Sequence, residues 1–470
     1  MENLDTLEAD YVITGAGTTA MAFADTLLSE STATMVIADR RSRPGGHWLD
    51  AYPFVRLHGA AAVYGVNSQP LGHGVIDSVG LNRGLSELAS GPEICAYFDR
   101  LMQHRLLPSG RVTYLSRHEI GADGVATSLV NGRRVRLKAR RKWVDAARAD
   151  SQVPATHKPN FRVADGVRLV TPTELTRLTE PASGFVIVGG GKTSIDTALW
   201  LLEHGADPDS ITWIRPRDAW LLNRADIQPT LPFAYSTLEA ITSELEVARD
   251  AASVQDLFAK LEARRLLLRI DPEVEPTMYR CATVSEAELE QLRRIRRVVR
   301  LGRVQAIERD RIVFAQGELA TTPGTVHVHC STSGLPRAPI EPVFQGERIV
   351  PQYVRRCSPS FSAAFIAHVE ATVETDEEKN ALCRPVRVPE LPIDWLRMHV
   401  DSAGNQLRWS QRPELQQWLR RSRLDAFMGL FEEAGRQAAS EGNTRWAELQ
   451  QRLRDARVAG IKRMGELLAA

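Results

Sequence analysis

The sequence predicts an α/β protein with two Rossmann-like dinucleotide-binding domains, a helical insertion and a helical C-terminal region. Three observations predict this fold class. Glycine-rich turns follow short apolar stretches near residue 15 and again near residue 189. Charged helical patterning dominates residues 230–300 and returns after about residue 390. With 470 residues, the chain is long enough for two or three domains.

The first glycine turn follows a short buried strand, residues 11–14, and precedes a helix that runs to about Leu28. Its spacing is G-x-G-x-x-A, given by Gly15, Gly17 and Ala20. A second apolar strand ends at Asp39, about 20 residues past the turn, where a carboxylate accepts a ribose hydroxyl. Because this carboxylate repels a 2′-phosphate, we expect FAD here, with Arg40 beside it.

The second turn lies in "FVIVGGGKTSID" and permits two interpretations at first. A triphosphate-binding loop needs a glycine where this chain has Val186, whose branched side chain does not open such a loop. A dinucleotide-binding turn needs a buried strand and then small residues at the spacing of Gly189, Gly191 and Ser194. The spacing therefore favours a second dinucleotide site. Lys192 either adds positive charge near a pyrophosphate or points to solvent.

Arginines follow the strand after the second turn, at the place where Asp39 follows the first. An arginine there offers a charge-assisted fork to a phosphate dianion. Arg215 and Arg217 therefore predict NADPH rather than NADH at the second site. The alternative is that both are solvated surface charges.

Composition limits the partners and the compartment. A net charge of +1 gives no reason to expect nucleic acid or a membrane surface as a partner, and the acidic N-terminus lacks an export pattern. We expect a cytoplasmic protein. The five cysteines show neither C-x-x-C nor metal-ligand spacing, so we expect five unpaired thiols, no metal site and no disulfide reductase chemistry.

A further element begins just after Asp39, in "RPGGHWLDAYPFVRLHG". This G-G-x-W stretch, placed after a flavin fingerprint, resembles the flavin-containing monooxygenases and the related Baeyer–Villiger monooxygenases. The resemblance covers about residues 10–370. It implies that Gly45, Gly46 and Trp48 line the flavin channel, and that "HCSTSGL", with Ser333 and Gly334, is the segment returning to the flavin domain. The family's F-x-G-x-x-x-H element is missing here.

The same resemblance implies an FAD domain interrupted by an NADPH domain. We expect the first part of the FAD domain over residues 1–170, with the crossing near Thr171-Pro172. The NADPH domain then spans 171–328, with the helical insertion at about 230–300. The FAD domain resumes over 329–390, and the C-terminal helical region covers 391–470.

The resemblance also implies the activity, namely oxygenation of a small molecule by molecular oxygen through a flavin C4a-hydroperoxide. It implies Asn67 as the residue beside the reactive flavin carbon, with Arg56, His58 and Tyr64 as possible neighbours. His58 is otherwise a satisfied structural residue, and Asn67 otherwise caps a turn. A homo-oligomer is possible.

Two other functions stay open. An NADPH-dependent flavoprotein reductase or dehydrogenase would insert no oxygen, and the missing histidine element favours it. A flavin-bound redox sensor would need no hydride donor, so an intact second site argues against it.

Overall fold

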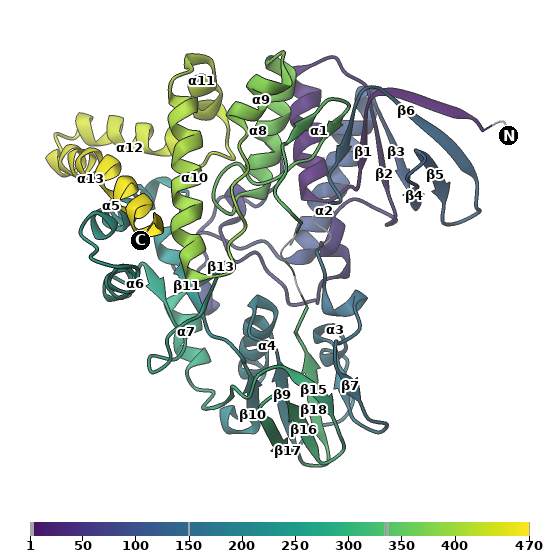
Figure 1. Ribbon diagram of the computed structural model, residues 1–470, viewed down its shortest axis with the longest axis vertical. Coiled ribbons are helices and arrows are strands. Elements are labelled where there is room, and N and C mark those ends of the chain that lie inside the picture. Colours follow the sequence, from purple (N-terminus) through teal and green to yellow (C-terminus); the bar gives the residue numbers. More distant parts are fainter. Residues whose placement is uncertain (1–3, 149–150, 333, 335–337, 470) are drawn as a thin grey trace.

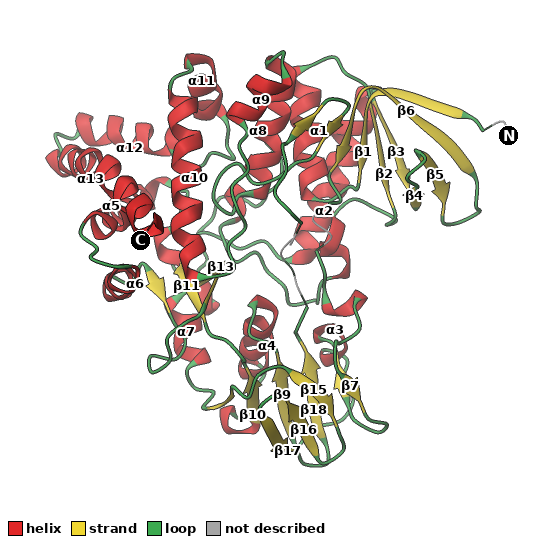
Figure 2. Cartoon of the chain, viewed as in Figure 1, coloured by secondary structure: helices red, strands yellow, loops and turns green. Residues whose placement is uncertain are grey.

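The computed structural model describes residues 4–148, 151–332, 334 and 338–469. In Figure 1 the first sheet lies at the upper right and the second at the bottom, with C-terminal helices at the upper left. Figure 2 shows the mixture of helices and strands. Two sheets of parallel strands, each with a glycine turn leading into a helix, confirm the predicted α/β class with two Rossmann-like domains.

The first domain is built on a sheet in the order β19-β20-β6-β1-β2-β3, in which β20, β6, β1, β2 and β3 run parallel. Its strands are β1 (Thr6–Thr14), β2 (Met35–Asp39), β3 (Val112–Ser116), β4 (His118–Ile120), β5 (Val125–Ser128), β6 (Arg134–Asp145), β19 (Phe344–Gln345) and β20 (Arg348–Ile349). Its helices are α1 (Thr18–Glu30), α2 (Gly91–Leu101), α8 (Pro359–Thr372) and α9 (Asp376–Leu382). Every residue of β2 is buried, and α8 packs against α1.

The second domain holds a fully parallel sheet in the order β14-β10-β9-β18-β8. These strands are β8 (Leu169–Val170), β9 (Gly184–Val188), β10 (Ile211–Ile214), β14 (Arg297–Val299) and β18 (Thr325–His329). A smaller sheet beside it contains β7 (Arg162–Val163), β15 (Val304–Ile307), β16 (Arg311–Phe314) and β17 (Gly317–Ala320). The helices are α3 (Pro172–Leu175), α4 (Lys192–Glu203) and α7 (Glu286–Leu292).

The crossing between the domains lies earlier than the expected position near residue 171. Strand β7 pairs with β15 and β8 pairs with β18, so both belong to the second domain. Each of these strands is only two residues long. Two residues are too few to show the apolar–polar alternation by which a strand is predicted. Their pairing depends on strands that lie far away in the sequence.

The insertion contains strands as well as the expected helices. It contains β11 (Ala219–Asn223), α5 (Ala234–Arg249), α6 (Val254–Ala263), β12 (Leu267–Leu268) and β13 (Met278–Val284), and its strands form a separate three-stranded sheet. The C-terminal region is helical as expected, with α10 (Pro392–Ser410), α11 (Pro413–Arg421), α12 (Met428–Ser440) and α13 (Thr444–Ala469). In the described part of the chain, no helix has the length and apolar character needed to cross a membrane.

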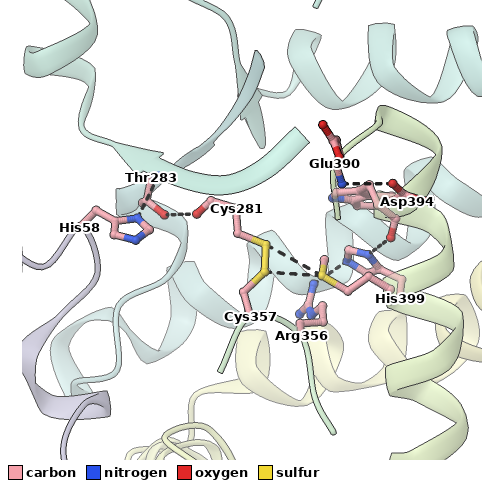
Figure 3. The surroundings of a disulfide bond; sticks show 10 residues. His58, Cys281, Thr283, Arg356, Cys357, Glu390, Asp394 and His399 are labelled. Atoms are coloured by element: carbon pink, nitrogen blue, oxygen red, sulfur yellow. Dashed lines mark hydrogen bonds between the residues drawn. A yellow bond between two sulfur atoms is a disulfide. The ribbon is translucent and has the colours of Figure 1, made fainter. Parts of the chain in front are cut away.

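The expectation of five unpaired cysteines is wrong. Cys281 of β13 and Cys357, which lies just before α8, form a disulfide across 76 residues of sequence (Figure 3). Their Cα atoms lie 6.6 Å apart. Only the tertiary fold brings the two together, so local spacing carried no signal. Cys95, Cys330 and Cys383 are free and buried.

Helix α13 packs tightly against α5 of the insertion. A Cβ atom at Gly460 would lie 2.5 Å from the carbonyl oxygen of Leu245, so the two backbones meet there. Arg452 of α13 pairs with Glu239 at 2.8 Å and with Glu246 at 2.9 Å, both on α5. The C-terminal region and the insertion therefore form one packed unit.

His58 joins the first domain to strand β13. Its Nδ1 accepts the backbone N–H of Thr283 at 3.2 Å, and its carbonyl oxygen accepts Nε–H of Arg224 at 3.0 Å. Burial, together with the charges of Lys192 and Arg224, lowers the pKa of His58 to about 3. The His58 imidazole is therefore neutral and bound to the backbone of β13.

Gly460→Ala should lower the free energy of unfolding by about 2 kcal/mol, because overpacking at a close backbone contact pushes the helices apart. The matched control is Gly465→Ala on the same helix, where no atom lies within 4 Å of the added Cβ. That variant should gain up to about 1 kcal/mol from helix propensity. Urea unfolding measures both, and equal effects would contradict the close contact.

His58→Phe should make stability less dependent on pH. The folded-state pKa lies below the unfolded value of 6.5, so stability is present above pH 6.5 and falls as the unfolded chain takes up the proton. Between about pH 6.5 and about pH 4, the free energy of unfolding of the variant should therefore fall less steeply with decreasing pH. The difference in slope should correspond to up to about one bound proton. His47, whose pKa burial lowers to about 4, keeps its share in both proteins. Parallel unfolding curves across this range would show that His58 is not buried as described.

Candidate functional site

A cavity of about 1860 Å³ lies against the first glycine turn. Its walls come from the first domain, from residues 351–353, from Arg217 of the second domain and from α10. Of the residues expected from the sequence, the lining includes Gly15, Gly17, Asp39, Arg40, Gly46, Arg217 and Gly334. Ser333 lies outside the described residues. The volume exceeds the roughly 300–1,000 Å³ of common small-molecule pockets.

The backbone of the first glycine turn lies close to Gly46. Gly46 has a φ of +58°, and a Cβ there would lie 2.9 Å from the Cα of Gly17. Gly17 is the N-cap of α1 and no side chain caps the helix. The first N–H groups of α1 and the positive end of its dipole therefore lie at the cavity, where they suit a pyrophosphate. Ala20 is fully buried beneath the turn.

Asp39 stabilises the glycine turn as well as lining the cavity. Its Oδ2 accepts the N–H of Ala16 at 2.5 Å, and its Oδ1 accepts the N–H of Arg41 at 2.6 Å. A carboxylate has about four lone-pair sites, so two stay available for ribose hydroxyls. The two backbone hydrogen bonds already hold the Asp39 side chain in place. Its position suits the ribose of a dinucleotide.

Tyr64 connects the G-G-x-W element to α1, which the sequence did not reveal. The indole N–H of Trp48 donates to the Tyr64 hydroxyl at 2.7 Å, and the same hydroxyl hydrogen-bonds with Thr18. Burial raises the pKa of Tyr64 to about 12, so the phenol keeps its proton. Tyr64 and Thr18 line the cavity. Trp48 is not among the described lining residues and contacts the cavity wall through Tyr64.

The second glycine turn has the same form. Gly191 is the N-cap of α4 without a side-chain cap, and Ser194 turns its hydroxyl to the Gly191 carbonyl at 2.6 Å. Gly189 has a φ of +138°, and a Cβ there would lie 2.8 Å from the carbonyl oxygen of Cys330. The uncapped N-terminus of α4 fits a second pyrophosphate. Gly189, Gly191 and Ser194 are not among the described residues that line the cavity.

Arg215 lies buried beside the second turn, not on the surface. Its guanidinium stacks over Trp213, 4.8 Å from the ring centroid, and pairs with Asp218 at 2.8 Å. Burial lowers the pKa of Arg215 to about 10. Its Nε, Nη1 and Nη2 have no hydrogen-bond partner among the described residues, and all three nitrogens are buried. The guanidinium therefore has unused donors, from which a phosphate could accept hydrogen bonds only after this burial is relieved. Arg217 is exposed and lies 3.5 Å from Glu390.

A buried polar cluster at the start of α4 meets the first domain. The Tyr52 hydroxyl donates to Asp196 Oδ2 at 2.7 Å, and the Lys192 ammonium pairs with the other oxygen of Asp196. Burial raises the pKa of Asp196, against the effects of Lys192 and Tyr52, which lower it. Lys192 is thus not directed only to solvent. The sequence analysis assigned Lys192 no role. The role depends on Asp196, one helical turn later, and on Tyr52, which comes from the other domain.

The proposed catalytic residues lie outside the described lining of the cavity. Asn67 Oδ1 accepts the Ser422 hydroxyl at 2.9 Å, so Asn67 contacts the C-terminal region. Arg56 is exposed, and His58 binds β13 as described above. Their catalytic roles stay predictions. Among the described residues, no group of three or more histidines, cysteines or carboxylates is arranged to hold a metal ion.

Comparisons with known proteins identify relatives. No family model matches the chain. It is 47% identical over 426 residues to an uncharacterized protein of Mycobacterium tuberculosis and to one of Mycobacterium bovis, covering 91% of this chain and 79% of each relative.

Similar solved structures include an open cyclohexanone monooxygenase, at 14% identity and a TM-score of 0.48 over 85% of this chain and 99% of that one. A cyclohexanone monooxygenase from Rhodococcus sp. Phi1 bound to NADP+ has 13% identity and a TM-score of 0.48, over 80% and 88% of the two chains. A flavin-containing monooxygenase from Stenotrophomonas maltophilia has 14% identity and a TM-score of 0.44, over 78% and 98%. On the strength of its 47% identity, the chain belongs to the family of the two mycobacterial proteins.

Proposed function

We propose that this protein is an FAD- and NADPH-dependent oxidoreductase that oxygenates a small molecule with molecular oxygen. One observation carries the proposal: two glycine turns open uncapped helices in two Rossmann-like domains, and the second helix is hydrogen-bonded to the first domain through Asp196 and Tyr52. Two dinucleotide sites joined in this way suit hydride transfer from one cofactor to the other.

The first site would hold FAD. The start of α1 would bind the pyrophosphate, and Asp39 would accept the adenosine ribose through its two remaining lone-pair sites. Gly46 would lie beside the cofactor, because it lines the cavity and a side chain there would collide with Gly17. Bound flavin accepts a hydride and activates oxygen, which the side chains here do not do themselves.

The second site would hold NADPH. The start of α4 would bind its pyrophosphate, with Lys192 adding positive charge. Arg215 would donate its unpartnered N–H groups to the 2′-phosphate after a local shift that exposes the buried guanidinium. Asp218 neutralises part of that charge, so the buried guanidinium keeps a counter-ion when the site is empty.

The cavity residues would hold water out and supply protons. Tyr64 keeps its proton because burial raises its pKa to about 12, so its hydroxyl can donate to an oxygen in the cavity. Trp48 and Thr18 fix its orientation. Oxygenation itself is supported by the resemblance of the G-G-x-W stretch, and the substrate is a small molecule bound in the remaining space.

Arg215→Lys should raise the KM for NADPH about tenfold and leave the KM for NADH within about twofold, because lysine keeps the charge but loses the bidentate fork. Arg217→Ala is the matched comparison, since Arg217 is exposed and should matter less. Steady-state kinetics with both cofactors measures the effect. Equal changes for NADPH and NADH would remove Arg215 from 2′-phosphate recognition.

The decisive functional test is oxygen labelling. Purified protein should carry FAD and consume NADPH, and under ¹⁸O₂ it should place one labelled oxygen in a product when screened with amines, thioethers and ketones. Mass spectrometry detects the label, and a peroxide assay accounts for uncoupled electrons. Gly46→Ala should lose FAD, whereas Gly74→Ala, also at positive φ but with no atom within 4 Å of its Cβ, should keep it.

The outcomes separate the alternatives. NADPH consumption with reduction of an added quinone, and no labelled product with any substrate, would replace oxygenation with a reductase function. Bound FAD that NADPH does not reduce would indicate a sensor. Protein that binds no flavin under any condition would contradict the proposal as a whole.

A further inference from the structure

We propose that the Cys281–Cys357 disulfide is a reversible redox modification site, through which thiols and disulfides in the surroundings set how firmly the insertion is held against the wall of the cavity. The proposal goes beyond the proposed function and does not depend on it. It rests on the location of the two cysteines, on their unequal exposure and on what else joins the two segments.

Cys281 lies at an irregular point of its strand. The pairing of β11 with β13 changes register between Trp220 and Leu222, and Cys281 falls within the matching stretch of β13. Its φ is +53°, in the left-handed region that a residue with a side chain seldom adopts. This backbone conformation is kept only where surrounding structure enforces it, and the bond to Cys357 is one such constraint.

Cys357 lies in a segment that connects the cavity to α8. Tyr353, four residues earlier, lines the cavity, and its carbonyl accepts the N–H of Val386, another lining residue, at 2.6 Å. Ser358 is the N-cap of α8, the helix that packs on α1. The disulfide therefore fastens the insertion to a segment that continues into the wall of the cavity.

The segment around Cys357 makes few other polar contacts with the insertion. The insertion is held elsewhere as well, because Arg224 donates to the His58 carbonyl and to Asn82 of the first domain. Arg356 pairs with Glu244 of α5 at 3.2 Å. It also meets His399 of α10 at 2.5 Å (Figure 3). The Sδ atom of Met398 lies 3.9 Å from Cys281 and 3.7 Å from Cys357. After reduction the segment would keep these contacts and its apolar packing, so the domain should stay folded. The insertion should, however, separate more often from the segment around Cys357.

The chemistry is ordinary thiol–disulfide exchange. Cys357 is partly exposed and Cys281 is buried, so an incoming thiolate attacks Sγ of Cys357. The S–S bond breaks, a mixed disulfide forms on Cys357, and Cys281 leaves as a thiolate that takes a proton. A second thiol then attacks the mixed disulfide. Two small thiols are oxidised to one disulfide, and the protein disulfide is reduced to two thiols; a small disulfide reverses both steps.

The first test counts thiols in the folded protein. Protein purified without reductant should show three alkylatable cysteines after unfolding, and five after prior treatment of the native protein with a phosphine reductant. Trypsin cleavage after Arg264 and Arg265, both exposed between α6 and β12, should become about tenfold faster on reduction, as local opening predicts. Neither readout requires a flavin or any activity.

The double variant Cys281→Ala/Cys357→Ala is the matched control. It should be cleaved at the rate of the reduced protein, with or without phosphine. Five free thiols in unreduced protein, a disulfide reducible only in denaturant, or an unchanged cleavage rate on reduction would each overturn the proposal. If NADPH does not reduce the flavin of the loaded enzyme, the proposed function fails, and these readouts still decide the redox site.

Discussion

The hydrogen bond from Tyr52 to Asp196 is the contact on which the proposed chemistry depends. Two separately folded nucleotide-binding units are useful together only if their helix N-termini are held in a fixed relation. Tyr52 comes from the segment after the G-G-x-W element, and Asp196 lies one turn into α4. The stacking of Phe54 on Trp200, at 5.3 Å, extends the same contact. A buried carboxylate held by a phenol and an ammonium gives this junction a defined geometry.

The C-terminal region stabilises the first site from the other side. Arg423 donates to the carbonyl oxygens of Ala62 and Tyr64 at 2.5 Å, and to those of Val66 and Gln69 at 2.8 and 2.9 Å. Four carbonyls on one guanidinium fix the loop that carries Tyr64 and Asn67. Since α13 also packs on α5, the C-terminal helices join the insertion to the first domain. The Arg423 contacts hold the loop that carries Tyr64, a residue of the cavity wall.

The sequence predicted the parts of the fold that local rules control. A buried strand, a glycine turn and a helix follow one another within about 20 residues, so Gly15, Gly189 and Asp39 could be located without tertiary information. The two-residue strands β7 and β8 could not, because their register depends on partners more than a hundred residues away. The same reason hid the Cys281–Cys357 disulfide and the pairing of Lys192 and Asp196 with Tyr52. The burial of Arg215 against Trp213 could not be predicted either. The exposure of a residue after a strand depends on which other segments of the fold pack against it.

The central claim is that the two nucleotide sites serve one reaction, and anaerobic mixing of the flavin-loaded protein with NADPH tests it most directly. Without oxygen only hydride transfer between the two sites is followed, so substrate identity does not matter. The account predicts that one equivalent of NADPH bleaches the visible absorbance of the bound flavin. It also predicts that Tyr52→Phe, which keeps the ring but loses the bond to Asp196, slows the bleaching while retaining the flavin. Tightly bound flavin that stays oxidised in excess NADPH and NADH would contradict it.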